Sequence, residues 1–200
     1  MRKILLFLVV LGFLAASGGL PGAARADEAA DRTLGKPDAP ITIIEYASLT
    51  CPHCAEFNKE IMPELKARYV ETGKAKVIYR DYPLDNWALK AAMVARCAPA
   101  DKYFSFIDVL FQNQVTWATA KDPKAALERI AKLGGMSSEQ FEACLANKAL
   151  EDAILAGSLK GQKDFDITGT PTIIVNGKKV DNPQSFADFD KILKPLAPQS

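Results

Sequence analysis

The four residues Cys51-Pro52-His53-Cys54 have the clearest potential for chemistry in this sequence. Two cysteines separated by two residues can close a disulfide, and the thiolate of one can attack other disulfides. His53 is the only histidine of the chain and would favour a thiolate at Cys51 if it were protonated or donated a hydrogen bond. The motif therefore predicts a redox dithiol in which Cys51 is an unusually acidic thiol.

The residues around this motif predict that it joins a strand to a helix. The preceding run Ile41–Ala47 is short, apolar and rich in β-branched residues, which is typical of a strand. The following run Ala55–Val70 is rich in good helix formers, with a kink or break expected at about Met62 because of Pro63. Cys51 would then lie at the helix N-terminus, where unpaired N–H groups and the helix dipole favour a thiolate.

A C-x-x-C pair is also half of a zinc site or the two ends of an inert disulfide. The other two cysteines, Cys97 and Cys144, are 47 residues apart, and a four-ligand site would need both of them beside the motif. An inert disulfide across so short a loop would remove little chain entropy. We therefore expect a redox pair that binds no metal and needs no cofactor.

The first 26 residues resemble a secretory signal peptide. Arg2 and Lys3 precede an apolar run of about 13 residues, and Ala24-Arg25-Ala26 follows as a small-residue cleavage pattern. A membrane anchor is the alternative, but the run is short for a bilayer. We expect cleavage after Ala26 and an exported chain that begins at Asp27.

Export bears on charge and on cysteine chemistry. Loss of Arg2, Lys3 and Arg25 reduces the 25 basic residues to 22, against 24 acidic ones, for a formal net charge of −2. No basic patch indicates binding to nucleic acid or to a membrane surface. Disulfides persist in an oxidising compartment, so the four cysteines can form two bridges.

The remaining patterns predict an α/β domain with a helical insertion. Residues 27–40 are polar and are interpreted as a leader, and a second strand is expected over Lys76–Tyr82. Helical periodicity extends over residues 86–165. Strand patterns return at 172–180 around the turn Asn176-Gly177, and a last helix ends near Pro195.

Two local signals mark helix ends inside the helical stretch. Pro123 is expected to open a helix that stops at Gly134-Gly135. Ser137 and Gln140 have the spacing of a capping box for the next helix.

Taken together, these residues resemble the DsbA-like thiol-disulfide oxidoreductases, which have a thioredoxin fold with an inserted helical domain. The motif Cys51-Pro52-His53-Cys54 matches the one typical of DsbA, and Gly169-Thr170-Pro171-Thr172 lies where thioredoxin-fold proteins keep a cis-proline. The resemblance implies a signal peptide (1–26), a thioredoxin-fold domain (27–85 and 166–200) and an inserted helical domain (86–165).

The resemblance also implies roles for the motif. Cys51 would attack and carry the mixed disulfide, and the more buried Cys54 would resolve it. Pro52 and His53 would tune the reduction potential, because a stabilised Cys51 thiolate stabilises the reduced protein.

Other roles fall outside the motif. Pro171, preceded by Thr170, would be a cis-proline that faces the sulfurs and leaves the neighbouring backbone free to pair with an extended substrate peptide. The alternative is an ordinary trans proline at the start of a strand. Glu45 would be a buried acid beneath Cys54 that accepts its proton through a water, or else an ordinary half-buried strand carboxylate.

Cys97 and Cys144 resemble a second, structural disulfide found in some α-proteobacterial relatives of that family. The alternative is two separate buried thiols that act as small apolar side chains. Thr170 precedes the proline where strong oxidases of the family often have valine and isomerases often have threonine.

The function implied is that of a periplasmic oxidoreductase that donates its Cys51–Cys54 disulfide to reduced or misoxidised exported proteins. A DsbB-like membrane partner would reoxidise it. A disulfide isomerase or reductase that is kept reduced is the first alternative, and a C-x-x-C metal-binding module is the second. We expect a monomer, since only about 14 residues separate Asp27 from the first strand and leave no room for a dimerisation domain.

Overall fold

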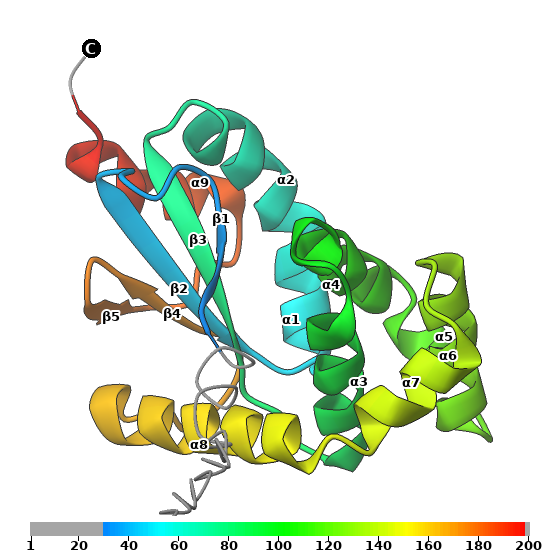
Figure 1. Cartoon of the computed structure of the whole chain (residues 1–200). Coiled ribbons are helices and arrows are strands. Elements are labelled where there is room, and N and C mark those ends of the chain that lie inside the picture. Colours follow the sequence, from blue (N-terminus) through cyan, green and yellow to red (C-terminus); the bar gives the residue numbers. More distant parts are fainter. Residues whose placement is uncertain (1–29, 199–200) are drawn as a thin grey trace, which may run out of the picture.

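A five-stranded mixed sheet lies at the centre of the computed structural model, which describes residues 30–198 (Figure 1). The signal segment expected at residues 1–26 lies outside the described residues. The spatial order is β1-β3-β2-β4-β5, in which β2 and β3 are parallel and the other pairs are antiparallel. The strands are β1 (Arg32–Leu34), β2 (Ile41–Ala47), β3 (Ala75–Asp81), β4 (Thr172–Val175) and β5 (Lys178–Val180).

Four of the five strands were predicted. β2 is central and almost wholly buried, which explains its unbroken apolar run. The strand expected at Lys76–Tyr82 is β3, one residue earlier at each end. At the β4–β5 turn, Asn176 and Gly177 have φ angles of 47° and 80°, as a tight hairpin turn requires.

The interpretation of residues 27–40 as a leader into the first strand was wrong, because the first strand, β1, already lies within them. β1 pairs antiparallel with β3, with Arg32 opposite Tyr79 and Leu34 opposite Val77. Next to it, Asp31 accepts two hydrogen bonds from Arg80, at 2.9 and 2.7 Å. A three-residue strand that is held through its backbone shows no period of two in the sequence, so the pattern missed it.

The helix after the C-x-x-C motif extends from Pro52 to Val70 and does not break at Pro63. It consists of α1 (Pro52–Glu56), the π-helix η1 (Phe57–Ile61), α2 (Met62–Leu65) and the π-helix η2 (Lys66–Val70). Pro63 follows the change from π to α pattern, and the N–H of Met62 donates to Phe57 O, five residues back. The helix is therefore not broken at Met62, where a kink or break was expected. Instead, its hydrogen-bond pattern changes from π to α at that residue.

Helices occupy the stretch between β3 and β4, as predicted. They are α3 (Asn86–Cys97), the 3₁₀-helix η3 (Ala100–Lys102), α4 (Tyr103–Gln112), α5 (Gln114–Ala118), α6 (Pro123–Leu133), α7 (Ser138–Leu145) and α8 (Lys148–Phe165). The predicted start of α6 and the Ser137–Gln140 capping box of α7 are confirmed. After β5 come α9 (Phe186–Leu193) and the 3₁₀-helix η4 (Lys194–Leu196).

The sheet is covered by helices on both faces (Figure 1). On one face, Phe57 and Leu65 of the helix after the motif and Phe189 of α9 pack against Ile43 and Val77. On the other face lies α8, whose approach depends on Gly161. A Cβ at Gly161 would lie 2.3 Å from the ring of Tyr46 in β2, so a larger residue there would push α8 off the sheet.

A third and larger apolar cluster joins the helices to the motif. It contains residues of α3, α4, α6 and α7 together with Cys51, Cys54 and Leu49. The helical stretch therefore packs directly on the active-site cysteines. The domain boundaries expected at 85/86 and 165/166 stay a prediction.

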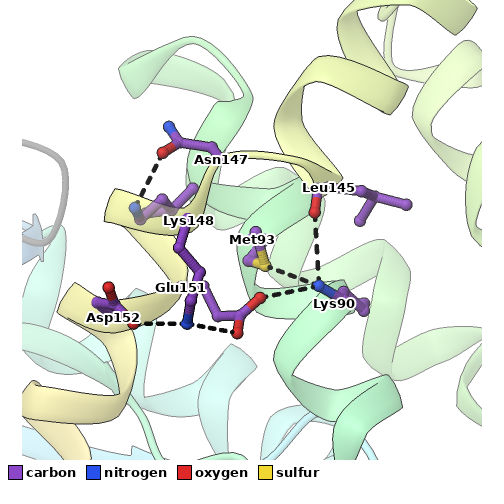
Figure 2. A network of polar contacts seen from close by, with 8 residues as sticks. Lys90, Met93, Leu145, Asn147, Lys148, Glu151 and Asp152 are labelled. Carbon is purple, nitrogen blue, oxygen red and sulfur yellow. Dashed lines mark hydrogen bonds and ion pairs between the residues drawn. The ribbon is translucent and has the colours of Figure 1, made fainter.

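A disulfide and a polar network tie α3, α7 and α8 together. Cys97 at the end of α3 is bonded to Cys144 in α7, with a Cα–Cα distance of 6.2 Å. Figure 2 shows Lys90 of α3 between the end of α7 and the start of α8. Its ammonium donates to Glu151 Oε2 (3.0 Å) and Leu145 O (3.4 Å).

Across residues 30–198, we find no helix with both the length and the apolar character needed to cross a membrane.

Candidate active site

Cys51 is the N-cap residue of α1, at the end of the loop that follows β2. Its backbone is extended, with φ −79° and ψ 119°, and Pro52 occupies the first helical turn, where its missing N–H has no cost. The Cys51 N–H donates to Ser48 O at 3.0 Å, and its carbonyl accepts from Ala55 N–H at 3.2 Å. This geometry directs the first amides of α1 towards the sulfur.

The two motif cysteines are unbonded here and differ sharply in acidity. The pKa of Cys51 is lowered to about 5, first by a hydrogen bond from Cys54, and further by Thr170 and by the backbone N–H groups of Cys54 and His53, against an opposing effect of burial. Cys54 has 0% exposure, and burial is the main reason that its pKa lies well above that of an ordinary thiol. The nucleophile is therefore Cys51, whose residue is 5% exposed, and Cys54 retains its proton.

The structure brings the predicted Thr170-Pro171 segment to the sulfur of Cys51. The Thr170–Pro171 peptide bond is cis, as predicted. The Cys51 thiol donates to Thr170 O at 3.3 Å, and Pro171 O accepts from Asn182 Nδ2 at 2.5 Å. The hydroxyl of Thr170 is buried and has no hydrogen-bond partner among residues 30–198, so it is free to donate to a thiolate at Cys51.

His53 lowers the pKa of Cys51 through its backbone, whereas the sequence suggested a contribution from its imidazole. Its side chain is 80% exposed, and Nδ1 lies 3.6 Å from Glu56 Oε2, one turn further along the helix. The contribution of His53 to the low pKa of Cys51 comes from its backbone N–H. The imidazole lies at the surface, where an approaching thiol or disulfide can meet it.

Glu45 is a buried acid within electrostatic range of both cysteines, and this excludes the half-buried alternative. It lies in β2, is 1% exposed, and its Oε1 has no hydrogen-bond partner in the described part of the chain. Burial raises its pKa to about 8, with further contributions from the Cys51 and Asp108 charges. Its charge in turn contributes to the raised pKa of Cys54. A carboxyl that titrates near neutral pH can exchange protons with a buried thiol, and its suggested role as proton acceptor stays a prediction.

Sequence reasoning missed two residues that fix the loop before Cys51. Gln114 of α5 is buried, and its Nε2 donates to Leu49 O and Cys51 O, both at 2.9 Å. Asp85, the N-cap of α3, accepts from Thr50 Oγ1 at 2.5 Å. A glutamine in an amphipathic helix gives no sequence signal for such a role, whereas Asp85 could have been recognised as an N-cap but not as a partner of Thr50.

A groove of about 340 Å³ lies between the helix after the motif and the cis-proline loop. Its walls come from both sides of the site, with His53, Phe57 and Ile61 from the helix after the motif and Thr170 and Pro171 from the cis-proline loop. A groove next to an open backbone edge suits an extended peptide. Cys97 and Cys144 do not line it, and because they are bonded to each other they are not available as metal ligands for the motif.

Comparison with known proteins agrees with this geometry. The thioredoxin family model matches residues 27–195. A Rickettsia bellii protein whose name describes a protein-disulfide oxidoreductase is 32% identical over 153 residues, which are 76% of this chain and 59% of that protein. The chain thus spans less than two thirds of the length of that relative. Disulfide bond formation protein D of Bacillus subtilis is 27% identical over 80% of this chain and 72% of its own length.

The crystal structure of Wolbachia pipientis alpha-DsbA1 resembles this chain over almost its whole length. The two are 32% identical, the TM-score is 0.77, and the match covers 89% of this chain and 92% of that one. With the acidic Cys51 above a buried Cys54, the cis-proline beside them and helices inserted between β3 and β4, the chain belongs to the DsbA-like thiol-disulfide oxidoreductases of the thioredoxin superfamily.

Proposed function

We propose that this protein is a periplasmic thiol-disulfide oxidoreductase that donates its Cys51–Cys54 disulfide to exported proteins. The observation that carries the proposal is the difference between the two thiols, since the pKa of Cys51 is lowered to about 5 while that of Cys54 is raised. A thiolate that is stable at neutral pH stabilises the reduced protein and makes its disulfide a stronger oxidant.

The reaction follows from this difference. A client thiolate attacks Cys51 Sγ, the Cys51–Cys54 bond breaks, and its electron pair goes to Cys54 Sγ, which takes up a proton. A second client thiolate then attacks the client sulfur of the mixed disulfide, and Cys51 leaves as a thiolate. The client is oxidised to a disulfide and the protein is reduced. Cys51 is a good leaving group because its pKa is low.

The partners follow from the site and from the expected export. Reduced or misoxidised exported proteins are the clients, and the groove beside Thr170 and Pro171 receives their cysteine-containing segment. The Cys51 thiolate attacks the disulfide of a DsbB-like membrane protein, and Cys54 then displaces that protein from Cys51. The Cys51–Cys54 disulfide is restored and the membrane partner is reduced. We propose that the protein acts as a monomer.

A disulfide isomerase is the second candidate, and Thr170 is the observation that favours it. Threonine at this position before the cis-proline is frequent in isomerases of the family. Its hydroxyl has no hydrogen-bond partner among residues 30–198 and can stabilise the Cys51 thiolate that a protein working in the reduced form needs. Isomerisation further requires that a client stay bound while its disulfides rearrange, which a second binding site in an oligomer would assist.

The deciding experiment compares two activities on one sample of known oligomeric state. Oxidised protein is mixed with a reduced model substrate, and reduced protein is mixed with the same substrate in scrambled form. We expect a monomer that oxidises the first efficiently and refolds the second poorly. A Cys51→Ala variant should be inactive in both assays and serves as the control.

A dimer or trimer that refolds the scrambled substrate efficiently would overturn the oxidase proposal and favour the isomerase. Loss of neither activity in the Cys51→Ala variant would overturn both.

A further inference from the structure

Thiol-disulfide exchange at this site requires a proton to cross a closed core. Cys54 gains a proton when the Cys51–Cys54 disulfide is reduced and loses it when the disulfide is restored, yet its side chain has 0% exposure. Glu45 is the candidate acceptor, because its charge acts on Cys54, but at 1% exposure it has almost no solvent contact through which to release the proton. The proton therefore needs a further group between Glu45 and water.

A small cavity leads from Glu45 to such a group. It has a volume of about 10 Å³ and is lined by both Glu45 of β2 and Asp108 of α4. A cavity needs roughly that volume to hold one water molecule, and two carboxyl groups give that water polar partners. Glu45 Oε1, which has no other partner among the described residues, is the atom that such a water would serve.

Asp108 links this cavity to the surface. Its side chain is 30% exposed, so its outer edge reaches solvent. The carboxylate is held by two residues of the helix after the motif. Asn58 Nδ2 donates to Oδ1 at 3.0 Å, and Lys66 Nζ lies 2.7 Å from Oδ2. Both of these residues also line the cavity.

We propose that Asp108, held by Asn58 and Lys66, is the outlet of a proton path that leads from Cys54 through Glu45 and a water in this cavity to solvent. Asp108 touches no reacting sulfur, and it is a positioning residue that acts through Glu45. The proposal rests on exchange at Cys51 and Cys54 and holds for an oxidase or an isomerase, since both protonate and deprotonate Cys54.

The steps balance in both directions. When the protein is reduced, the electron pair of the broken S–S bond stays on Cys54 Sγ, Glu45 gives its proton to that sulfur, and a proton from solvent restores Glu45 by way of Asp108 and the water. When the protein is reoxidised, Glu45 first releases its proton to solvent by way of the water and Asp108. Its carboxylate then takes the proton of Cys54, whose sulfur displaces the partner thiolate from Cys51.

Several titratable groups face Glu45 and shape its protonation. Those whose charges interact with it or share its cavity are Cys51 and Cys54 from the motif, Tyr79 from β3, Tyr103 and Asp108 from α4, and Lys66 from η2. Tyr79 and Tyr103 are buried and their pKa values are raised well above the usual tyrosine range by burial. They stay neutral during exchange. Asp108 and Lys66 both line the cavity and are partly exposed, at 30% and 27%, but a carboxylate can accept a proton whereas an ammonium group has no acceptor atom, so Asp108 is the group that can take a proton from the water.

The test uses the step in which Cys54 must lose its proton. Reduced full-length protein reacts with an aromatic disulfide reagent in two phases. In the first phase the Cys51 thiolate attacks and releases one coloured thiolate, and in the second phase Cys54 resolves the mixed disulfide and releases another. We expect Asp108→Asn to slow the second phase about tenfold, less than the roughly 10²-fold effect of a group that transfers the proton directly, and to leave the first phase unchanged.

Three further measurements separate a proton path from a packing contact. Asp108→Glu should retain most of the second-phase rate, and the exposed Asp101→Asn, next to the start of α4, should behave as the parent protein does. Added imidazole buffer should restore the second phase of Asp108→Asn, because a small buffer replaces a lost proton carrier but does not repair packing. The thermal unfolding midpoint of each variant shows whether it is folded.

Equal second-phase rates for Asp108→Asn and the parent protein across pH 6–9 would overturn the proposal. So would a slow second phase that imidazole does not restore, because that result indicates a packing role. Absence of the first phase in the parent protein would instead contradict the proposed exchange function itself.

Discussion

At the scale of single residues, Cys51 and Cys54 are only three residues apart, yet the pKa of the first is lowered and that of the second is raised. Cys51 caps α1 and receives hydrogen bonds from Cys54 and from backbone N–H groups, so its thiolate is stabilised. Cys54 lies one turn into the helix, is fully buried and is close to the Glu45 carboxyl, so its charged form is disfavoured. Since the Cys54 thiol is itself the strongest donor to Cys51, the neutral state of one cysteine supports the charged state of the other.

This coupling gives a prediction for Cys54. In the reduced protein, Cys54→Ala should raise the pKa of Cys51 by about one to two pH units, because a hydrogen bond to a charged group contributes about 1.5–3 kcal/mol. Cys54→Ser retains a donor and should leave the pKa closer to about 5. Thiolate absorbance followed from acid to neutral pH measures both, and equal pKa values in the two variants would contradict the role assigned to Cys54.

The sequence predicted the reacting residues better than their surroundings. Cys51, Cys54 and Pro171 belong to short motifs whose chemistry is readable from residue type and spacing. Gln114 and Asp108 make contacts between segments that are distant in the chain, and no local pattern marks them. The surface position of the His53 side chain was equally unreadable, because it depends on a pairing with Glu56 instead of Cys51.

At the scale of elements, the helices of the insertion are fastened in two different ways. The Cys97–Cys144 disulfide joins α3 to α7 covalently. Lys90 joins α3 to Glu151 of α8 and to the carbonyl of Leu145 at the end of α7 (Figure 2). Within α8, Lys148 also contacts Glu151 and Asp152, so Glu151 pairs with one lysine of its own helix and one of α3. The charge network is partly exposed and adds less to stability than the covalent link.

Removal of this disulfide should destabilise the protein without impairing its chemistry. For a closed loop of 47 residues, the chain-entropy model gives about 4 kcal/mol of stabilisation. We expect Cys97→Ala/Cys144→Ala to lower the free energy of unfolding by about that amount, measured by urea unfolding with Cys51 and Cys54 oxidised.

Exchange by that double variant with an aromatic disulfide reagent provides the control, because neither cysteine lines the groove. A change in unfolding free energy below about 1 kcal/mol would contradict the entropic role of the link.

Element prediction succeeded where a segment carries its own signal. The capping box of α7, the proline at the start of α6 and the Asn176-Gly177 turn are all local signals, and all were found. β1 and the two π-helical segments were missed. The first exists because the edge of β3 offers it backbone partners, and the π segments lie in a helix whose sequence is that of an ordinary α-helix.

At the scale of the whole molecule, the active site lies between two cores. The apolar cluster of the inserted helices includes both motif cysteines, while the rest of the helix after the motif packs on the sheet through Phe57 and Leu65. A change in the charge of Cys51 therefore occurs in the body of the folded protein, and folding and redox state are linked. The stability of the protein should depend on pH differently in its two redox states.

The sign of this linkage follows from the pKa of Cys51. In the reduced protein the pKa of Cys51 is about 5, below the reference value of 9.0. The ionised Cys51 therefore stabilises the folded protein fully above the unfolded-state pKa, and this contribution disappears as pH falls through about 5. In the oxidised protein Cys51 does not titrate. The raised pKa of Glu45 makes both forms less stable as pH rises towards 8, so most of its effect cancels in the difference between them.

We therefore expect the reduced protein to gain stability relative to the oxidised protein as pH rises from 5 to 8. One proton contributes at most about 1.4 kcal/mol per pH unit, and solvent screening at the open side of Cys51 lowers this slope. Urea unfolding of both redox forms at three pH values measures the difference. A Cys51→Ala/Cys54→Ala variant is the control. Provided that the Cys97–Cys144 disulfide remains intact, adding reductant should not change how the free energy of unfolding of this variant depends on pH. Parallel pH curves for the two forms of the parent protein would show that Cys51 is not an acidic thiol in the folded state.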